Sequence, residues 1–175
     1  TELPGVKIIE PRVFGDPRGF FVETFQLERY RELAGIELPF VQDNHSRSRR
    51  GVLRGLHTQK ARPQGKLLRV ARGEVFDVVA DINPASATFG RWVGAVLSEE
   101  NQRQLWVPPG YAHGFVVTSE VADFEYKVTD YYDPSSETGV IWNDPDLKID
   151  WPVDNPTLSE KDRRLPTLAE IKAAR

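Results

Sequence analysis

The sequence contains no cysteine, and its 175 residues include only three histidines, His45, His57 and His113. The absence of cysteine excludes disulfides, thiolate nucleophiles and cysteine-ligated metals. No apolar run approaches the roughly 18 residues that a membrane-spanning helix needs. The first residues do not combine a basic region with an apolar one, as secretion signals do. A cytoplasmic protein that binds no membrane is therefore the expectation.

A strong charge of either sign is also lacking, since the net charge is −3 at pH 7. Nucleic-acid binders and proteins of anionic membranes are usually basic, so no nucleic acid is expected as a partner. A small anionic ligand held by a local group of Arg and Lys stays compatible with this charge. The length is that of one domain, which we expect to span residues 1–175.

What the chain has in abundance is short strand-like segments, spaced roughly 8–12 residues apart and separated by turn residues. One short helix is expected over residues 26–35, with Gly35 at its C-terminus. From about residue 151 the chain reads as irregular, with short helical turns. The pattern predicts an all-β sandwich or jelly roll with helix only at its edges. The expected strands are "VKIIEPRVF", "GFFVETF", "FVQDNHS", "GVLRGLHTQ", "GKLLRVARG", "GEVFDVVADI", "GRWVGAVLS", "RQLWVPPG", "AHGFVVTS", "DFEYKVTDYY" and "GVIWND".

Side-chain alternation predicts that polar groups point into the sandwich. Tyr126 alternates with Phe124 and Val128 in "DFEYKVTD", and is therefore expected to face inward. In the same way, Lys66 begins the inward row of "GKLLRV", and His113 shares a face with the apolar residues of "AHGFVV".

The segment "GVLRGLHTQ" carries two further polar groups that alternation would separate. His57 shares a face with Leu53, whereas Arg54 falls on the opposite face. A bulge at Gly55 would turn both side chains toward the same space, and glycine within a strand commonly marks a bulge.

An interior that receives His, Lys and Tyr suits proton transfer. Histidine serves as a base near neutral pH, a phenol donates a proton, and a cation stabilises a developing oxyanion. Each group also has a structural interpretation: a hydrogen-bonded histidine, a packed tyrosine or a solvated lysine. A metal site is disfavoured, because no two histidines are spaced as H-x-H and "HTQKARPQGK" offers no carboxylate after His57.

The chain resembles the dTDP-4-dehydrorhamnose 3,5-epimerase family over nearly its whole length. The matching motifs are "DPRGFFVETF", "FVQDNHSRSRRGVLRGLH", "QGKLLRVARGEVFDVVADI", "SATFGRWVG", "VPPGYAHGFVV", "YKVTDYYDP", "IWNDPDLKIDWP" and "LSEKD". The resemblance implies a cupin jelly-roll β-sandwich whose C-terminal segment folds back over the barrel. It also implies a homodimer with exchanged N-terminal strands, and chemistry without a cofactor or metal.

The resemblance implies that the substrate is a dTDP-linked 4-keto sugar, dTDP-4-dehydro-6-deoxy-D-glucose. His57 of "RGLH" would remove the protons beside the keto group, and Asp162 of "LSEKD" would orient it. Tyr126 would return protons on the opposite face, and Lys66 would stabilise the enolate oxygen. Arg18 and Arg54 would hold the diphosphate and Tyr132 would stack on the thymine, with further nucleotide or sugar contacts from Glu23, Gln42, Asp43, Asn44, His113, Glu137 and Lys161.

Two departures from the family pattern affect the edge of the expected pocket. Thr58 follows His57 where the family usually has an aromatic residue, and the loop from His57 to Lys66 is about one residue shorter than expected from the family resemblance. Several alternatives to the family function stay open. One is an epimerase acting only at C3 or only at C5, or a ketoisomerase. The others are a metal-dependent jelly-roll oxygenase and a non-catalytic sugar-nucleotide binding module.

Overall fold

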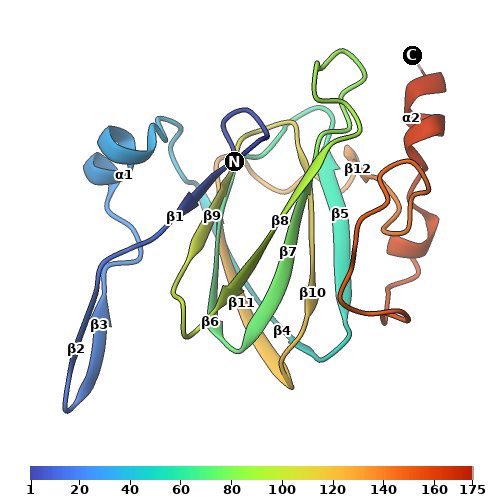
Figure 1. The fold of residues 1–175 in the computed structure, drawn as a ribbon. Helices are drawn as coiled ribbons and strands as arrows, with labels where there is room; N and C mark the ends of the chain where they lie inside the picture. The colour runs from blue at the N-terminus through green and yellow to red at the C-terminus, as the bar shows by residue number, and fades with distance from the viewer. Residues whose placement is uncertain (175) are drawn as a thin grey trace.

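The computed structural model describes residues 1–174, which form two five-stranded antiparallel sheets packed face to face (Figure 1). The first sheet has the order β1-β9-β6-β11-β4 and the second the order β12-β5-β10-β7-β8. The first sheet consists of β1 (Lys7–Ile9), β9 (Gln104–Val107), β6 (Lys66–Arg72), β11 (Val121–Val128) and β4 (Gln42–Arg49). The second consists of β12 (Glu137–Gly139), β5 (Leu53–Gln59), β10 (Ala112–Val117), β7 (Glu74–Ala80) and β8 (Trp92–Ser98).

The core between the sheets follows the predicted alternation. Residues 75 and 79 of β7, 68 and 70 of β6, and 115 and 117 of β10 join one buried apolar cluster. Phe115 and Phe124 stack at its centre, with ring centroids 4.1 Å apart. Apolar burial of this kind contributes about 2 kcal/mol for each large side chain. The jelly-roll sandwich expected from the sequence is therefore confirmed.

The C-terminal segment covers the outer face of the second sheet (Figure 1). It contains a 3-10 helix (Asp162–Arg164) and α2 (Leu168–Ala173). Leu147 and Leu168 of this segment pack on Leu56 and Val78, which point outward from β5 and β7. The backbone of Thr157 also bonds to β5, because Leu53 N donates to its carbonyl at 3.0 Å. The segment thus folds back over the barrel, as expected.

The N-terminal part forms a separate layer on the first sheet. Helix α1 (Leu27–Ala34) ends at Gly35, whose φ of 64° is left-handed, as its place after the helix predicts. Tyr30 of α1 packs with Leu67 and Trp106 on the outer face of the first sheet. Neither helix of the described chain is long and apolar enough to cross a membrane.

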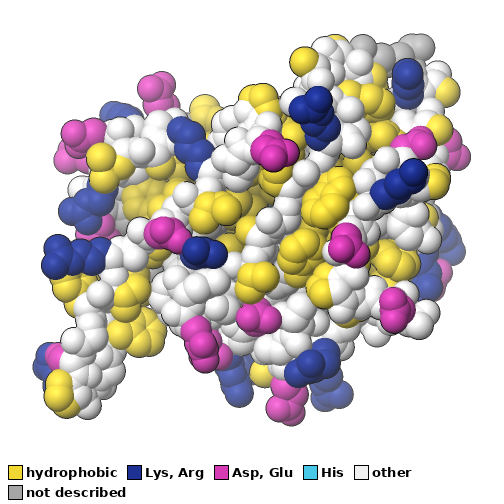
Figure 2. Space-filling view, in the orientation of Figure 1, with side chains coloured by type: hydrophobic (Ala, Val, Ile, Leu, Met, Phe, Trp, Pro, Cys, Tyr) yellow, Lys and Arg dark blue, Asp and Glu magenta, His cyan; other side chains and the backbone are white. Residues whose placement is uncertain are grey.

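A two-stranded hairpin, β2 (Val13–Asp16) and β3 (Gly19–Val22), projects away from the sandwich (Figure 1). Its aromatic side chains are solvent-exposed, Phe20 by 64% and Phe21 by 68%. Figure 2 shows hydrophobic side chains on this projection. One strand was expected over "VKIIEPRVF", but the chain leaves β1 at Ile9 and begins β2 at Val13. Pro11 lies in the break, where it has no amide hydrogen to donate to a sheet.

The last expected strand, "GVIWND", is placed differently in the structure. Strand β12 covers residues 137–139 and ends where that segment was expected to begin. Val140 still exchanges two backbone hydrogen bonds with Leu56 of β5. Beyond it the chain turns into the C-terminal segment, because the side chain of Asp144 accepts hydrogen bonds from the backbone of Asp146 and Leu147.

The bulge predicted in β5 is present. His57 of β5 faces His113 of β10 and Arg54 faces Phe115, so three steps along β5 match two along β10. Gly55 lies in the bulge with a φ of +119°. A Cβ atom there would approach the Cα of Gly114 to 2.6 Å. Only glycine fits this close strand pairing, and the extra residue brings Arg54 and His57 to the same side of β5.

Gly55→Ala is therefore expected to lower the free energy of unfolding by about 3 kcal/mol, because it adds a backbone clash to an unfavourable φ. Gly110 is a matched control, since its φ is +101° but a Cβ would meet nothing within 4 Å. Gly110→Ala should cost only about 1 kcal/mol. Urea unfolding of both variants at equal protein concentration measures the difference, and equal losses would contradict the role given to the clash.

Candidate active site

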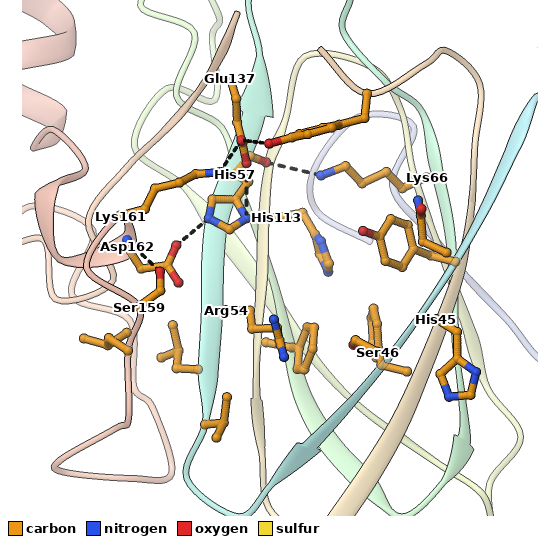
Figure 3. Close-up of a pocket in the computed structure, with 18 of the residues that line it drawn as sticks. His45, Ser46, Arg54, His57, Lys66, His113, Glu137, Ser159, Lys161 and Asp162 are labelled. Carbon is orange, nitrogen blue, oxygen red and sulfur yellow. Dashed lines mark hydrogen bonds and ion pairs between the residues drawn. The ribbon is translucent and has the colours of Figure 1, made fainter. Parts of the chain in front are cut away.

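A cavity of about 590 Å³ opens between the two sheets and is bordered by the C-terminal segment (Figure 3). Its walls come from β4, β6 and β11 of the first sheet, and from β5, β10 and β12 of the second. Most of the predicted site residues line this cavity: Gln42, Asn44, Arg54, His57, Lys66, His113, Tyr126, Tyr132, Glu137, Lys161 and Asp162.

His57 is fixed by a carboxylate that lies 105 residues further along the chain. Its Nε2 lies 2.5 Å from Oδ1 of Asp162, which the 3-10 helix brings to β5. Burial alone would raise the pKa of Asp162, but the hydrogen bond and charge of His57, with Ser159, bring that pKa below its usual range. Nε2–H of His57 donates a hydrogen bond to the ionised carboxylate of Asp162, so Nδ1 carries the lone pair. His57 is thus arranged as a base whose free nitrogen is Nδ1.

A buried charge cluster lies beside His57. Nε2 of His113 lies 2.9 Å from Oδ2 of Asp77, and the Asp77 side chain is fully buried on β7. Burial raises the pKa of Asp77 and lowers that of His113, while the attraction between the two opposes both shifts. The ring of His113 stacks on Phe124, with centroids 6.0 Å apart. Figure 3 shows His113 directed into the cavity.

Lys66 is the buried cation of the site. Its ammonium donates a hydrogen bond to the backbone carbonyl of His57, with Nζ and O 3.3 Å apart. Burial lowers the pKa of Lys66 to about 8, although the charges of Asp77 and Glu137 act in the opposite direction. A desolvated ammonium that keeps its proton at neutral pH interacts strongly with a nearby oxyanion.

Tyr126 lies on the first sheet, whereas His57 lies on the second, so the two groups belong to opposite walls. Burial raises the pKa of the Tyr126 phenol; the charge of Arg54 lowers it, and Glu137 and Tyr132 raise it further. The phenol is therefore protonated at neutral pH and can donate. Nε of Arg54 donates to Oγ of Ser48 at 3.0 Å, which leaves the outer nitrogens of the guanidinium for a ligand.

A second hydrogen-bonded group lies at the mouth of the cavity. Glu137 of β12 accepts hydrogen bonds through Oε2 from the Tyr132 hydroxyl, at 2.6 Å, and from the ammonium of Lys161. Its other oxygen lies 3.9 Å from Nδ1 of His57. Tyr132 is 50% exposed, so one face of its ring is available to a planar ligand.

Three predicted residues lie outside the cavity in the single chain. Arg18 is at the turn of the projecting hairpin, paired with Asp16, and Glu23 follows that hairpin and pairs with Arg29. Asp43 alternates with Gln42 and Asn44, so its carboxylate is on the opposite face of β4, where it bonds to Lys127. The role assigned to each predicted site residue, inside or outside the cavity, stays a prediction.

Other residues of the site were missed by the sequence reasoning. Asp77 did have a signal in the sequence, because it is an acidic residue in the same inward row of "EVFDVVA" as Val75 and Val79. Ser48 and Ser159, which support Arg54 and Asp162, had no distinctive signal in the sequence. Thr58, the departure from the family pattern, is not among the residues that line the cavity.

A jelly-roll sandwich with a carboxylate-held histidine, a buried cation and a protonated phenol around one cavity defines a cupin-type enzyme built for proton transfer. The model of the family dTDP-4-dehydrorhamnose 3,5-epimerase matches residues 1–170. The chain belongs to this family.

Individual relatives agree with this assignment. A protein of Pseudomonas aeruginosa named dTDP-4-dehydrorhamnose 3,5-epimerase is 57% identical over 96% of this chain and 93% of its own. The crystal structure of a dTDP-6-deoxy-D-glucose-3,5-epimerase from Legionella pneumophila, in complex with dTDP-4-keto-L-rhamnose, is 56% identical. It covers 99% of this chain and 93% of its own, with a TM-score of 0.95. A Streptomyces niveus protein named dTDP-4-dehydrorhamnose 3-epimerase is 40% identical over 98% of this chain and 84% of its own.

Proposed function

We propose that this protein inverts C3 and C5 of dTDP-4-dehydro-6-deoxy-D-glucose to give dTDP-4-dehydro-L-rhamnose, in the biosynthesis of dTDP-L-rhamnose. The observation that carries the proposal is His57, whose Nε2 is held by Asp162 at 2.5 Å while Lys66 and Tyr126 line the facing wall. Both carbons lie beside the 4-keto group, so both C–H bonds are acidified by the same carbonyl. No redox change is required.

In each inversion, Nδ1 of His57 takes a proton from carbon, and the electron pair moves into an enolate. The ammonium of Lys66 stabilises the enolate oxygen, a contact that strengthens as charge develops in the transition state. Tyr126 then donates its proton to the other face of the carbon. Because His57 and Tyr126 lie on opposite walls, one can remove a proton from one face of the sugar while the other returns a proton to the opposite face. A single base could do both only if the sugar turned over in the site. The orientation of His57 by Asp162 follows the general base–orienter arrangement.

The nucleotide would occupy the outer part of the cavity. Arg54 offers its free guanidinium nitrogens to the diphosphate, and Tyr132 offers an exposed ring to the thymine. Gln42, Asn44, His113, Glu137 and Lys161 line the same space and supply further contacts.

The active form is a homodimer with exchanged N-terminal strands. The hairpin β2–β3 makes no sheet with the rest of its own chain and exposes Phe14, Phe20 and Phe21 by 50 to 68%. Exposed aromatic residues gathered on one projection are typical of a protein interface. Exchange of this hairpin would carry Arg18 and Glu23 to the partner's cavity, which accounts for their distance from the cavity of their own chain.

The first test locates the inverted carbons. Turnover of the 4-keto sugar nucleotide in deuterated water should place deuterium at both C3 and C5, as read by NMR, because each inversion returns a proton from solvent-exchangeable Tyr126. Deuterium at C3 alone would favour the 3-epimerase alternative, for which the Streptomyces niveus relative is named.

Dialysis against a chelator tests the oxygenase alternative. Activity that disappears with the chelator and returns with one metal would favour that alternative.

The pairing of His57 with Asp162 predicts a non-additive double-mutant cycle. His57→Asn and Asp162→Asn should each lower kcat by about 10²–10⁴-fold. The double variant should have nearly the same kcat as the less active of the two single variants. Asp154→Asn, an exposed carboxylate of the same segment, is a matched control that should keep normal activity. Fully multiplicative losses for His57 and Asp162 would show that the two act independently.

The burial of Lys66 predicts an alkaline limit to activity. With a pKa of about 8, Lys66 loses its proton as the pH rises through that value, and the neutral amine no longer stabilises the enolate. We expect kcat/KM to fall about tenfold per pH unit above pH 8. The raised pKa of Tyr126 keeps that group out of this range. Lys66→Arg stays charged, so its activity should be lower but kcat/KM should no longer fall above pH 8. If the fall above pH 8 is unchanged in this variant, a group other than Lys66 causes it.

A further inference from the structure

The proposed function creates a requirement that the roles of His57 and Tyr126 do not meet. Each inversion breaks a C–H bond and leaves the proton on Nδ1 of His57, and it forms a new C–H bond with the proton of Tyr126. The site then holds an imidazolium and a phenolate. The next inversion, at the other carbon or on the next substrate, needs a neutral His57 and a protonated Tyr126. One proton must therefore return from His57 to Tyr126 after every inversion.

Asp162 does not serve as the acceptor for this return. It is bonded to Nε2, whereas the substrate proton arrives on Nδ1, at the other side of the ring. It is also only 3% exposed, within the C-terminal segment. The position of Asp162 therefore suits a residue that orients the imidazole, and its burial leaves no contact with solvent through which a proton could leave.

Glu137 lies near Nδ1 of His57, the nitrogen that Asp162 does not contact. Its Oε1 lies 3.9 Å from Nδ1 of His57, a separation that a small rotation of the side chain shortens to a hydrogen bond. Figure 3 shows Glu137 and Asp162 on different sides of the His57 ring. We propose that Glu137 is the base that accepts the proton from Nδ1 of His57 and so resets the site after each inversion. This proposal rests on the proposed function, and it deepens that function by adding a proton acceptor.

The other contacts of Glu137 connect it with solvent. Its Oε2 accepts hydrogen bonds from Tyr132 and Lys161, whose side chains are about half exposed at the mouth of the cavity. Burial alone would raise the pKa of Glu137, but the bonds from Lys161 and Tyr132 and the charge of His57 bring it below its usual range. The carboxylate is therefore ionised before it accepts the proton, and it releases that proton readily.

The balance of the step is complete with water as the only co-reactant. The proton leaves Nδ1 for Oε1 of Glu137, so His57 becomes neutral and Glu137 becomes a carboxylic acid. Glu137 then gives the proton to water at the mouth. The phenolate of Tyr126 takes a proton from water in the cavity. The sum is one proton moved from His57 to Tyr126, with no redox change.

Rapid-quench kinetics with substrate in tenfold excess over sites tests this assignment. The wild type should form inverted product without a burst. Glu137→Gln keeps the size and the hydrogen-bonding ability of the side chain but accepts no proton. It should give a burst of one inversion per site, followed by a steady phase slower by about tenfold or more. A linear, uniformly slowed time course would overturn the proposal, because it would make Glu137 only a substrate contact.

Two further variants separate this role from substrate binding. Lys161→Met removes the ion pair but keeps the carboxylate, so it should raise KM without a burst. Glu137→Ala should regain its steady phase as formate is added, because a small carboxylate can replace the missing acceptor; no response to formate would count against the proposal. A burst of one inversion per site is expected from Glu137→Gln whether the enzyme inverts one carbon or two, so the burst tests Glu137 alone. Wild-type product inverted at a single carbon would contradict the two-carbon function while leaving the role of Glu137 supported.

Discussion

The hydrogen bond between His57 and Asp162 is the interaction on which the site depends, because it joins the last part of the chain to a central strand of the second sheet, 105 residues earlier. It decides which nitrogen of His57 is free, and in the proposed mechanism this is the nitrogen that accepts the substrate proton. Leu147 and Leu168 position the carboxylate by packing the C-terminal segment on the outer face of the second sheet. Burial of apolar surface on one face of that sheet thus sets the chemistry on the other.

The interior of the sandwich tolerates charge because each charged group has a partner. Asp77 is paired with His113, and Lys66 bonds to a backbone carbonyl and lies within the field of Asp77 and Glu137. An unpaired charge at this depth would be costly, since removing one partner of a buried pair typically destabilises by about 3–5 kcal/mol. The low dielectric that makes the pairs necessary also strengthens the attraction of Lys66 for any anionic group that enters the cavity. The charges that must be paired for stability are therefore also the charges that the cavity presents to a ligand.

Alternation along single strands predicted much of this arrangement from the sequence. It placed Tyr126, Lys66 and His113 in the interior, and the glycine in "LRGLH" indicated the bulge that brings Arg54 and His57 together. Alternation also puts Asp43 on the opposite face of β4 from Gln42, whereas its assignment to the site came from the family resemblance alone.

Pairings between distant segments were beyond such reasoning. Periodicity states that a side chain points inward, but it does not state which strand lies opposite, so the bond between Asp77 and His113 was missed. Only the family resemblance connected Asp162 with His57. The early end of β12 differs from the expectation because the packing of the C-terminal segment, which draws the chain away from β5, has no local signal. The end of β1 had such a signal in Pro11, which the expectation of one continuous strand did not take into account.

The separation of Asp162 from His57 along the chain has a consequence during protein synthesis. Every strand of both sheets is complete once residue 139 has been made, whereas Asp162 emerges later. The sandwich can therefore close around its cavity on the ribosome before His57 meets the carboxylate of Asp162, so the cavity forms earlier than the hydrogen bond that fixes the ring of His57.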